Sequence, residues 1–314
     1  MRRFPADVVR VLCDELTPAE RIGELLGEHV VETSSPPWSG NDVAALVSFA
    51  PVTAEDLGRL PALRVVSTPS VGFDHVDVAA ATTRGVWVCH VPDYCIDEMA
   101  DHALALLLAL LRGVVELDRD VRSGRWDYEA AGPLRRVGDI RLGVIGFGRI
   151  GRALAARARA LGMEVCVHDP FVSDEVIAGT GARPETFHDL LQSSDAISVH
   201  APLTEETRAL IGRAQLALLP ENAVVVNVSR GALVETEAVL EALASGRLAG
   251  AALDVLDVEP PTPDVPAPVA PRLIVTPHAG WYSERAEDEA LRRSAEAVRD
   301  VLAGRRPANP VNEV

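Results

Sequence analysis

The sequence predicts an α/β protein with two domains, each built around a parallel sheet. Short apolar runs alternate with amphipathic segments along most of the chain, as in sheets whose strands are joined by helical crossovers. The glycine-rich turn at residues 146–151 (GFGRIG) follows a strand-like run and opens a helix-like segment, the context that a nucleotide-binding turn requires. A length of 314 residues also favours two domains, and an apolar fraction of 48% is enough for two cores.

The first domain is expected to comprise residues 1–100 together with residues 284–314. Strands are predicted at residues 8–12, 44–49, 63–66 and 86–89, and helices at residues 18–28 and 54–60. A long helix is expected at residues 96–123, followed by an irregular stretch at residues 124–138. The most apolar part of that helix, residues 103–111, is too short to span a bilayer and indicates a buried helix.

The second domain is expected at residues 101–283 and has a more regular pattern. Its six predicted strands are residues 142–145, 164–168, 196–200, 224–228, 251–255 and 273–276. Six parallel strands with helical crossovers are what a doubly wound dinucleotide-binding sheet needs. The segment 260–271 contains six prolines and should be a loop, and residues 283–304 should form an amphipathic helix long enough to return to the first domain.

Composition excludes several classes of function. A net charge of −16 argues against a nucleic-acid partner, because binding a phosphate backbone needs a basic face. All 30 basic residues are arginine, which excludes Schiff-base chemistry and phosphate loops that end in Gly-Lys-Ser/Thr. The four cysteines lack paired CxxC spacing, so buried thiols in a reducing compartment are expected. Arg10 interrupts the apolar run near the start, so we expect no signal peptide, no membrane association and a cytoplasmic location.

The glycine-rich turn and Asp169 together predict a dinucleotide site. Gly146 suits the tight turn, Gly148 the approach of the pyrophosphate, and Gly151 close packing of helix on strand. Asp169 ends the next apolar run at nearly the spacing at which an acid binds the adenosine ribose, and its charge would repel a 2′-phosphate. NAD is therefore expected rather than NADP. Two alternatives for the glycine-rich turn are a tight turn that binds no nucleotide and the similar turn of a methyltransferase.

Three polar residues at the carboxyl ends of later strands predict the chemistry. His278 could donate a proton to a carbonyl near neutral pH, and Glu259 could orient and charge that imidazole. Arg230 offers a rigid, permanently charged fork for a substrate carboxylate. Taken singly, each is more often structural: a surface ion pair, a residue of a solvated loop, or one of eight histidines, of which His200 is the second choice as acid.

Together with further motifs along the chain, these residues resemble those of the D-isomer-specific 2-hydroxyacid dehydrogenases. The motifs that carry the resemblance are GFGRIG, SVHAPLTEET, NVSRGALVE, GAALDVLDVEPP and VTPHAG, with STPSVGFDHVD at residues 67–77 in the first domain. The family fold implies two Rossmann-like doubly wound domains with the active site in the cleft between them. It also implies an NAD-binding second domain, a flavodoxin-like substrate-binding first domain, and dimerisation through the nucleotide domain.

The resemblance also implies roles for individual residues. Arg230, Glu259 and His278 would be catalytic, with no metal, and the N–H groups of Val71 and Gly72 would hold the substrate carboxylate. Asp254 would bond the nicotinamide amide. The full set expected at the cofactor is Gly146, Gly148, Arg149, Ile150, Gly151, Asp169, His200, Ala201, Pro202, Thr207, Val228, Ser229, Arg230, Asp254, His278 and Gly280.

A narrower resemblance is to the branch that contains the C-terminal-binding protein corepressors and their bacterial dehydrogenase relatives. DPFVSDEV and PHAGWYSERA carry it, and Trp281 would by analogy contact the substrate side chain, with a domain-interface role as the alternative. His75 departs from the asparagine that many relatives have in VGxDN. Tyr94 and Cys95 are further candidates for the same crevice.

We therefore expect a homodimeric NAD-dependent oxidoreductase that interconverts a 2-oxo acid and its D-2-hydroxy acid. His278 and Glu259 would relay the proton, while Arg230, Val71 and Gly72 bind the carboxylate. The alternative is an NAD(H)-sensing dimeric binding module of the corepressor type with little turnover.

Overall fold

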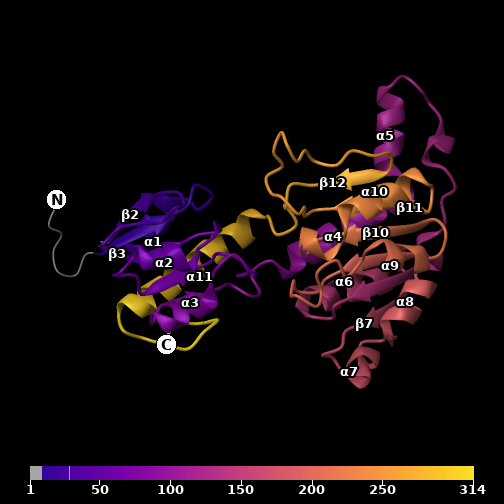
Figure 1. Ribbon diagram of the computed structural model, residues 1–314. Coiled ribbons are helices and arrows are strands. Elements are labelled where there is room, and N and C mark those ends of the chain that lie inside the picture. The colour runs from indigo at the N-terminus through magenta and orange to yellow at the C-terminus, as the bar shows by residue number, and fades with distance from the viewer. Residues whose placement is uncertain (1–8, 28) are drawn as a thin grey trace. The chain divides into compact units, whose positions relative to one another are not determined.

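The computed structural model describes residues 9–27 and 29–314, which form two compact units (Figure 1). The first unit holds the described residues up to Tyr94 together with Ser283–Val314, and the second is Cys95–Tyr282. The predicted division after residue 100 falls inside helix α4, Ile96–Arg112, whereas the observed division precedes it. The division precedes α4 because the whole of this helix packs on a helix and two strands of the second unit. Val8 and Glu28, at the ends of predicted elements, lie outside the described residues.

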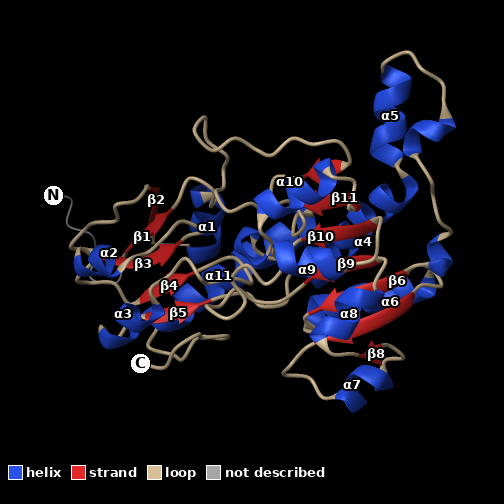
Figure 2. Cartoon of the chain, turned by 45° about the vertical axis from the view of Figure 1, so that its right-hand side comes forward, coloured by secondary structure: helices blue, strands red, loops and turns tan. Residues whose placement is uncertain are grey.

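The first unit is a five-stranded parallel sheet in the order β2-β1-β3-β4-β5, a doubly wound order (Figure 2). Its elements are β1 (Arg10–Cys13), α1 (Ala19–Leu26), β2 (Val30–Thr33), β3 (Val43–Val47), α2 (Ala54–Gly58), β4 (Val65–Ser67), α3 (Val78–Thr83), β5 (Trp87–Cys89) and α11 (Glu284–Leu302). The sequence pattern missed β2 and α3. Strand β2 was missed because it lies at the sheet edge and none of its residues is buried, so its sequence shows little alternation of apolar and polar residues.

Helix α11 completes the core of the first unit although it comes from the far end of the sequence. Ser283 caps it by accepting a hydrogen bond from the N–H of Ala286 at 3.0 Å. Its apolar stripe, which includes Leu291, Val298 and Val301, packs with β1, β3 and β4 in one hydrophobic cluster. The helix predicted at residues 283–304 is thus confirmed.

The second unit has a seven-stranded parallel sheet in the order β12-β11-β10-β9-β6-β7-β8. Its remaining elements are α5 (Val114–Arg122), two 3₁₀ turns (Tyr128–Ala131 and Val137–Asp139), β6 (Arg141–Ile145), α6 (Arg149–Ala160), β7 (Glu164–His168), α7 (Asp174–Gly179), β8 (Arg183–Pro184), α8 (Phe187–Ser193), β9 (Ala196–Val199), α9 (Arg213–Leu218), β10 (Ala223–Asn227), a 3₁₀ turn (Gly231–Leu233), α10 (Thr236–Ala244), β11 (Leu248–Leu253) and β12 (Leu273–Val275). The six predicted strands are all present, and β8 is the seventh. Counted from β8, this is the Rossmann order, and the direction of winding reverses between β6 and β9. The predicted fold class is therefore confirmed.

The expected single helix at residues 96–123 is wrong, because the chain breaks at Gly113. This glycine is left-handed, with φ of 59°, and ends α4 before α5 begins. A Cβ there would lie 2.8 Å from the Cβ of Ala131. Figures 1 and 2 show α5 and the turn after it standing away from the sheet of this unit.

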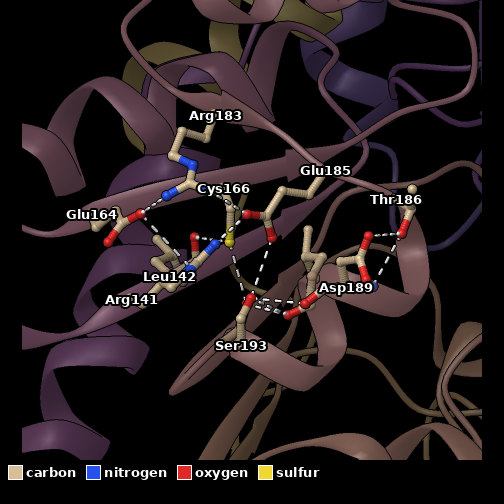
Figure 3. A network of polar contacts seen from close by, with 11 residues as sticks. Arg141, Leu142, Glu164, Cys166, Arg183, Glu185, Thr186, Asp189 and Ser193 are labelled. Atoms are coloured by element: carbon tan, nitrogen blue, oxygen red, sulfur yellow. Dashed lines mark hydrogen bonds and ion pairs between the residues drawn. The ribbon is translucent and has the colours of Figure 1, made fainter.

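A network of charged side chains holds the short edge strand β8 (Figure 3). Arg183 reaches Glu164 on β7 at 3.1 Å, and Glu185 accepts from Ser193 on α8 at 3.2 Å. Arg141 on β6 pairs with the same Glu185. Since β8 pairs with β7 through only two residues, these contacts add attachment that the backbone ladder lacks.

All four cysteines are buried free thiols, as expected. Burial raises the pKa of Cys13 and of Cys89 to about 12. Among residues 9–27 and 29–314, no helix is long and apolar enough to cross a membrane.

Candidate active site

The glycine-rich turn joins β6 to α6 at the point where the winding of the sheet reverses. Gly146 has φ of 92°, and a Cβ on it would lie 2.7 Å from the backbone of His200 and Ala201. A Cβ on Gly151 would clash with the carbonyl oxygen of Gly146, whereas one on Gly148 would meet nothing within 4 Å. The turn is therefore closed toward β9 and open at Gly148, which leaves room for a pyrophosphate at the helix N-terminus.

The start of α6 suits an anion. In the part of the chain that the structure describes, no side chain caps this helix, so its first N–H groups keep their hydrogen-bonding capacity. Arg149 is exposed at the first helical position, and Ile150 is half-buried beside it. These residues fit the phosphates of a dinucleotide.

Asp169 is tied directly to the glycine-rich turn. Its Oδ2 accepts a hydrogen bond from the N–H of Phe147 at 2.6 Å, and its Oδ1 accepts from the N–H of Phe171 at 2.8 Å. The carboxylate at the end of β7 thus lies beside the turn, where the ribose adjoining a bound pyrophosphate would be.

The end of β9 lies next to this turn. His200 donates its backbone N–H to Ile145 of β6 at 2.7 Å, and its Nε2 lies 2.8 Å from Ser198 Oγ. Burial lowers the pKa of His200 to about 4, so the imidazole is neutral near pH 7 and is a poor proton donor. Ala201 and Pro202 continue into a turn closed by Thr207, whose hydroxyl donates to the Pro202 carbonyl at 2.7 Å.

Arg230 follows β10 on a turn that Asn227 fixes. Asn227 donates to the carbonyl of Arg230 at 2.8 Å and accepts from the N–H of Ser229 at 3.1 Å. Ser229 in turn donates to the carbonyl of Val199, the last residue of β9, at 2.8 Å. Val228, the first residue after β10, is buried. The arginine is therefore carried on a backbone anchored to two strands.

Glu259 and His278 form a direct pair. His278 Nδ1 lies 2.6 Å from Glu259 Oε2, and the N–H of Leu256 donates to Glu259 Oε1 at 2.6 Å. Burial alone would raise the pKa of Glu259, but the hydrogen bonds from His278 and Leu256 and the charge of Arg230 hold it below its usual value. A Cβ on Gly231, next to Arg230, would clash with the backbone of Leu256, so the arginine turn and the glutamate loop are in close contact.

Asp254 anchors the segment that carries His278. Its side chain is fully buried, and its oxygens accept from Thr276 Oγ1 at 2.6 Å and from the N–H groups of Ala279 at 2.9 Å and Gly280 at 3.0 Å. Burial alone would raise the pKa of Asp254, but these bonds, with His102 Nε2 at 3.2 Å, keep it below its usual value.

The backbone of Asp254 also fixes His278. Its carbonyl accepts the N–H of His278 at 2.8 Å, and His278 has a left-handed backbone with φ of 52°, uncommon for a residue with a side chain. The surrounding hydrogen bonds thus impose an uncommon backbone conformation on the residue that carries the imidazole.

The remaining predicted residues lie in different places. Val71 and Gly72 are half-buried in the turn after β4 of the first unit. Trp281 makes an edge contact with Tyr282, with ring centroids 5.6 Å apart. Cys95 is buried at the start of α4, and Tyr94 is the last residue before the division between the units.

Sequence reasoning did not single out Asn227, Thr276 and His102, which position the turns that carry Arg230 and His278. His102 is one of the eight histidines of the sequence. It lies on α4, two residues after the buried Ala100, and its Cδ2 would be 3.2 Å from a Cβ on Gly280. The signal that could have found Asn227 and Thr276 is a short hydrogen-bonding side chain next to the motif residues, as in NVSR and VTPH, whereas His102 on α4 carries no such signal.

A Rossmann sheet with a glycine-rich turn, an acid bonded to that turn and a paired histidine and glutamate is typical of a dinucleotide-dependent oxidoreductase. Residues 104–280 match the model of the D-isomer specific 2-hydroxyacid dehydrogenase, NAD binding domain. A glyoxylate reductase of Korarchaeum cryptofilum is 39% identical over 278 residues, which are 87% of this chain and 83% of that protein.

Two further relatives agree. The D-3-phosphoglycerate dehydrogenase of Methanocaldococcus jannaschii is 37% identical over 272 residues, 86% of this chain, although the chain spans only 52% of that protein. The D-lactate dehydrogenase of Aquifex aeolicus, solved with NAD and lactic acid, superposes with a TM-score of 0.84 at 26% identity, covering 94% of this chain and 96% of that one.

The chain belongs to the D-isomer-specific 2-hydroxyacid dehydrogenase family. It is an NAD-dependent dehydrogenase of 2-hydroxy acids. The narrower resemblance to the corepressor branch stays a prediction.

Proposed function

We propose that the protein reduces a 2-oxo acid to its D-2-hydroxy acid, with His278 as the proton donor, Glu259 as its partner and Arg230 as the carboxylate clamp. The observation that carries this proposal is the 2.6 Å contact between His278 Nδ1 and Glu259 Oε2. Since a carboxylate can only accept, Nδ1 carries the proton of this bond, and Nε2 is the atom that exchanges a proton with substrate.

Bound NADH would supply the hydride at the carbonyl carbon. The glycine-rich turn, the start of α6 and Asp169 hold the dinucleotide, and Gly146 and Gly148 shape the turn for it. When hydride reaches the carbon, the carbonyl oxygen gains negative charge, and protonated His278 transfers its Nε2 proton to that oxygen. Glu259 stabilises the imidazolium before the transfer and fixes the ring orientation.

The guanidinium of Arg230 binds the substrate carboxylate and polarises the adjacent carbonyl. The N–H groups of Val71 and Gly72, in the first unit, are proposed as further donors to the substrate carboxylate. A 2-oxo acid with a carboxylate next to its carbonyl satisfies both roles, whereas a simple ketone does not.

The test is NADH oxidation with glyoxylate, hydroxypyruvate, pyruvate, phenylpyruvate and 2-oxo-4-methylthiobutyrate. Against the best substrate, His278→Ala should lower kcat by roughly 10²–10⁴-fold, the usual contribution of a general acid. Arg230→Ala should raise KM and lower kcat, and Glu259→Gln should lower kcat while keeping an acceptor for Nδ1. The control is His188→Ala, on an exposed histidine of α8. Near-normal turnover in a folded His278→Ala or Arg230→Ala variant would falsify the assigned roles.

A preference for NAD over NADP is part of the proposal. The Asp169 carboxylate, fixed by two backbone N–H groups, cannot turn away from a 2′-phosphate without losing those bonds. We expect kcat/KM for NADH to exceed that for NADPH by about ten-fold or more, which corresponds to roughly 1.4 kcal/mol. Asp169→Ser should lower the ratio of kcat/KM for NADH to kcat/KM for NADPH. Equal use of both cofactors by the wild type would contradict this preference.

A homodimer is the proposed assembly, with the arm formed by α5 and the turn after it as the contact surface. Trp126 and Tyr128 on this arm are 91% and 83% exposed, and Val114 and Val121 are also exposed. Light scattering should give twice the chain mass, and the Trp126→Ser, Tyr128→Ser double variant should weaken the dimer. Phe171→Ser, which removes an equally exposed aromatic elsewhere in the unit, is the control. A wild-type monomer at micromolar concentration would exclude this assembly.

A further inference from the structure

The turn after β4 in the first unit has its carbonyl groups anchored one after another. The carbonyl of Ser70 accepts the N–H of Val91 at 2.9 Å. The carbonyl of Val71 accepts from His90 Nδ1 at 2.8 Å, and that of Gly72 accepts from Ser70 Oγ at 2.6 Å. Three successive peptide groups are thus held by their oxygen atoms.

Anchoring a carbonyl also aims the next N–H. A trans peptide is planar, and its C=O and the following N–H point in opposite directions. The bond from Val91 therefore turns the N–H of Val71 away from the anchored side, and the bond from His90 does the same for the N–H of Gly72. Within the described residues, neither N–H donates a hydrogen bond to the protein. They form a pair of donors available to an anion.

His90 is itself held firmly. It follows β5, its backbone N–H donates to the carbonyl of Asn309 at 3.3 Å, and the adjoining Cys89 forms a bridge with Pro310. The ring of Phe73 meets the His90 ring edge-on, with centroids 5.2 Å apart and planes at 85°. The imidazole therefore has one fixed place, from which Nδ1 reaches the Val71 carbonyl.

We propose that His90 is a positioning residue that aims the Gly72 N–H at the substrate carboxylate by holding the Val71–Gly72 peptide. It touches neither substrate nor cofactor. A carbonyl cannot donate, so Nδ1 of His90 must carry the hydrogen of this bond. This inference rests on the proposed role of Val71 and Gly72 in carboxylate binding.

Two substitutions separate the hydrogen bond from the packing of the ring. His90→Phe keeps an aromatic ring against Phe73 but has no donor. His90→Asn places its Nδ2 close to where Nδ1 lies, and so keeps the donor while losing the ring. The matched control is His188→Phe, on the exposed face of α8 in the other unit.

The measurements are KM for the best 2-oxo acid, KM for NADH, kcat, and the inhibition constant of oxamate, a carboxylate that is not reduced. In His90→Phe, KM for the 2-oxo acid and the oxamate constant should rise by roughly ten-fold, the usual effect of misaiming one hydrogen bond to a charged group. The KM for NADH and kcat should stay within about two-fold, because the other unit is untouched. His90→Asn should stay near the wild type in all four.

A general loss of stability would lower activity without this split between the two KM values, and it would affect His90→Asn as well. The inference is overturned if His90→Phe keeps the wild-type KM, or if His90→Asn raises KM as much as His90→Phe. If the wild type reduces none of the 2-oxo acids, it is the proposed function that fails. If the wild type is active and the variants do not separate, only the role of His90 fails.

Discussion

Replacing Asp254 by asparagine tests the anchor of the histidine-bearing segment. The carboxylate is fully buried and accepts from Thr276, Ala279 and Gly280. Asparagine keeps one oxygen on the side of Thr276 and Ala279, but its amide then faces the Gly280 N–H as a second donor. At least one buried N–H loses its acceptor, and two charge-assisted bonds become neutral.

The magnitude follows from these contacts. A buried donor without an acceptor costs about 1–3 kcal/mol, and exchanging an ionic for a neutral acceptor costs about 1 kcal/mol per bond. Part of this is offset because a neutral side chain is easier to bury. We expect Asp254→Asn to lose about 3 kcal/mol, which lowers Tm by about 6–12 °C for a unit of this size.

The pH dependence of this effect has a definite sign. Because the folded pKa of Asp254 lies below its unfolded value, its stabilisation is present above the unfolded pKa, about 3.9, and is lost as pH falls through the folded pKa. The difference in Tm between wild type and Asp254→Asn should therefore be full at pH 7 and should shrink below about pH 4.

The assay is thermal unfolding followed by circular dichroism, with Asp257→Asn as the control, since Asp257 is an exposed aspartate of the same loop. The control should melt with the wild type at every pH. A Tm for Asp254→Asn within roughly 2 °C of the wild type at pH 7 would mean a cost below 1 kcal/mol and would refute the reasoning.

Three further results are expected. Gly146→Ala should lower Tm, because its Cβ would lie 2.7 Å from the backbone after β9, whereas Gly148→Ala should keep Tm and weaken NADH binding in a fluorescence titration. Equal Tm values for the two would contradict the packing described. His200→Asn should make Tm less sensitive to acid, because burial lowers the pKa of His200 to about 4 and the unfolded chain takes up a proton as pH falls below about 6.5. The same change of Tm with pH in the wild type and in His200→Asn would argue against this lowered pKa. Cys13 and Cys89, with pKa values of about 12, should react with Ellman's reagent at pH 8 only after denaturation, so rapid native labelling of either would count against their burial.

The sequence could predict the strands that are buried on both faces, because such strands are continuous apolar runs. All four residues of β9 are buried and fall within a predicted strand for this reason. The edge strands β2 and β8 could not be found in this way. The first has no buried residue, and the second has only two residues, Arg183 and Pro184, whose pairing depends on charged neighbours.

The break at Gly113 was missed for a related reason. One glycine inside an apolar helical pattern is tolerated in many helices, so the pattern alone does not reveal a left-handed residue. What decides it here is the close approach of Ala131 from a later turn, a contact that comes from tertiary packing.

Pairing of Glu259 with His278 was predicted because both residues follow strands that end at the same edge of a parallel sheet. The residues that hold them in place were not. Asn227 acts through bonds to the backbone of its own turn, Thr276 donates its hydroxyl to the carboxylate of Asp254, and His102 comes from a distant helix. A sequence pattern indicates where strands end, but it does not indicate which side chains will hydrogen-bond to the segments that follow them.

The composition of the first unit from two separated segments has a consequence for synthesis. During translation, β1 to β5 leave the ribosome well before α11, yet the cluster around Val298 and Val301 closes only when that helix arrives. The second unit is one continuous segment and has all its strands once residue 275 is made. The part of the chain made first is therefore the last to complete its core, reversing the usual order in which an N-terminal domain matures before the one that follows.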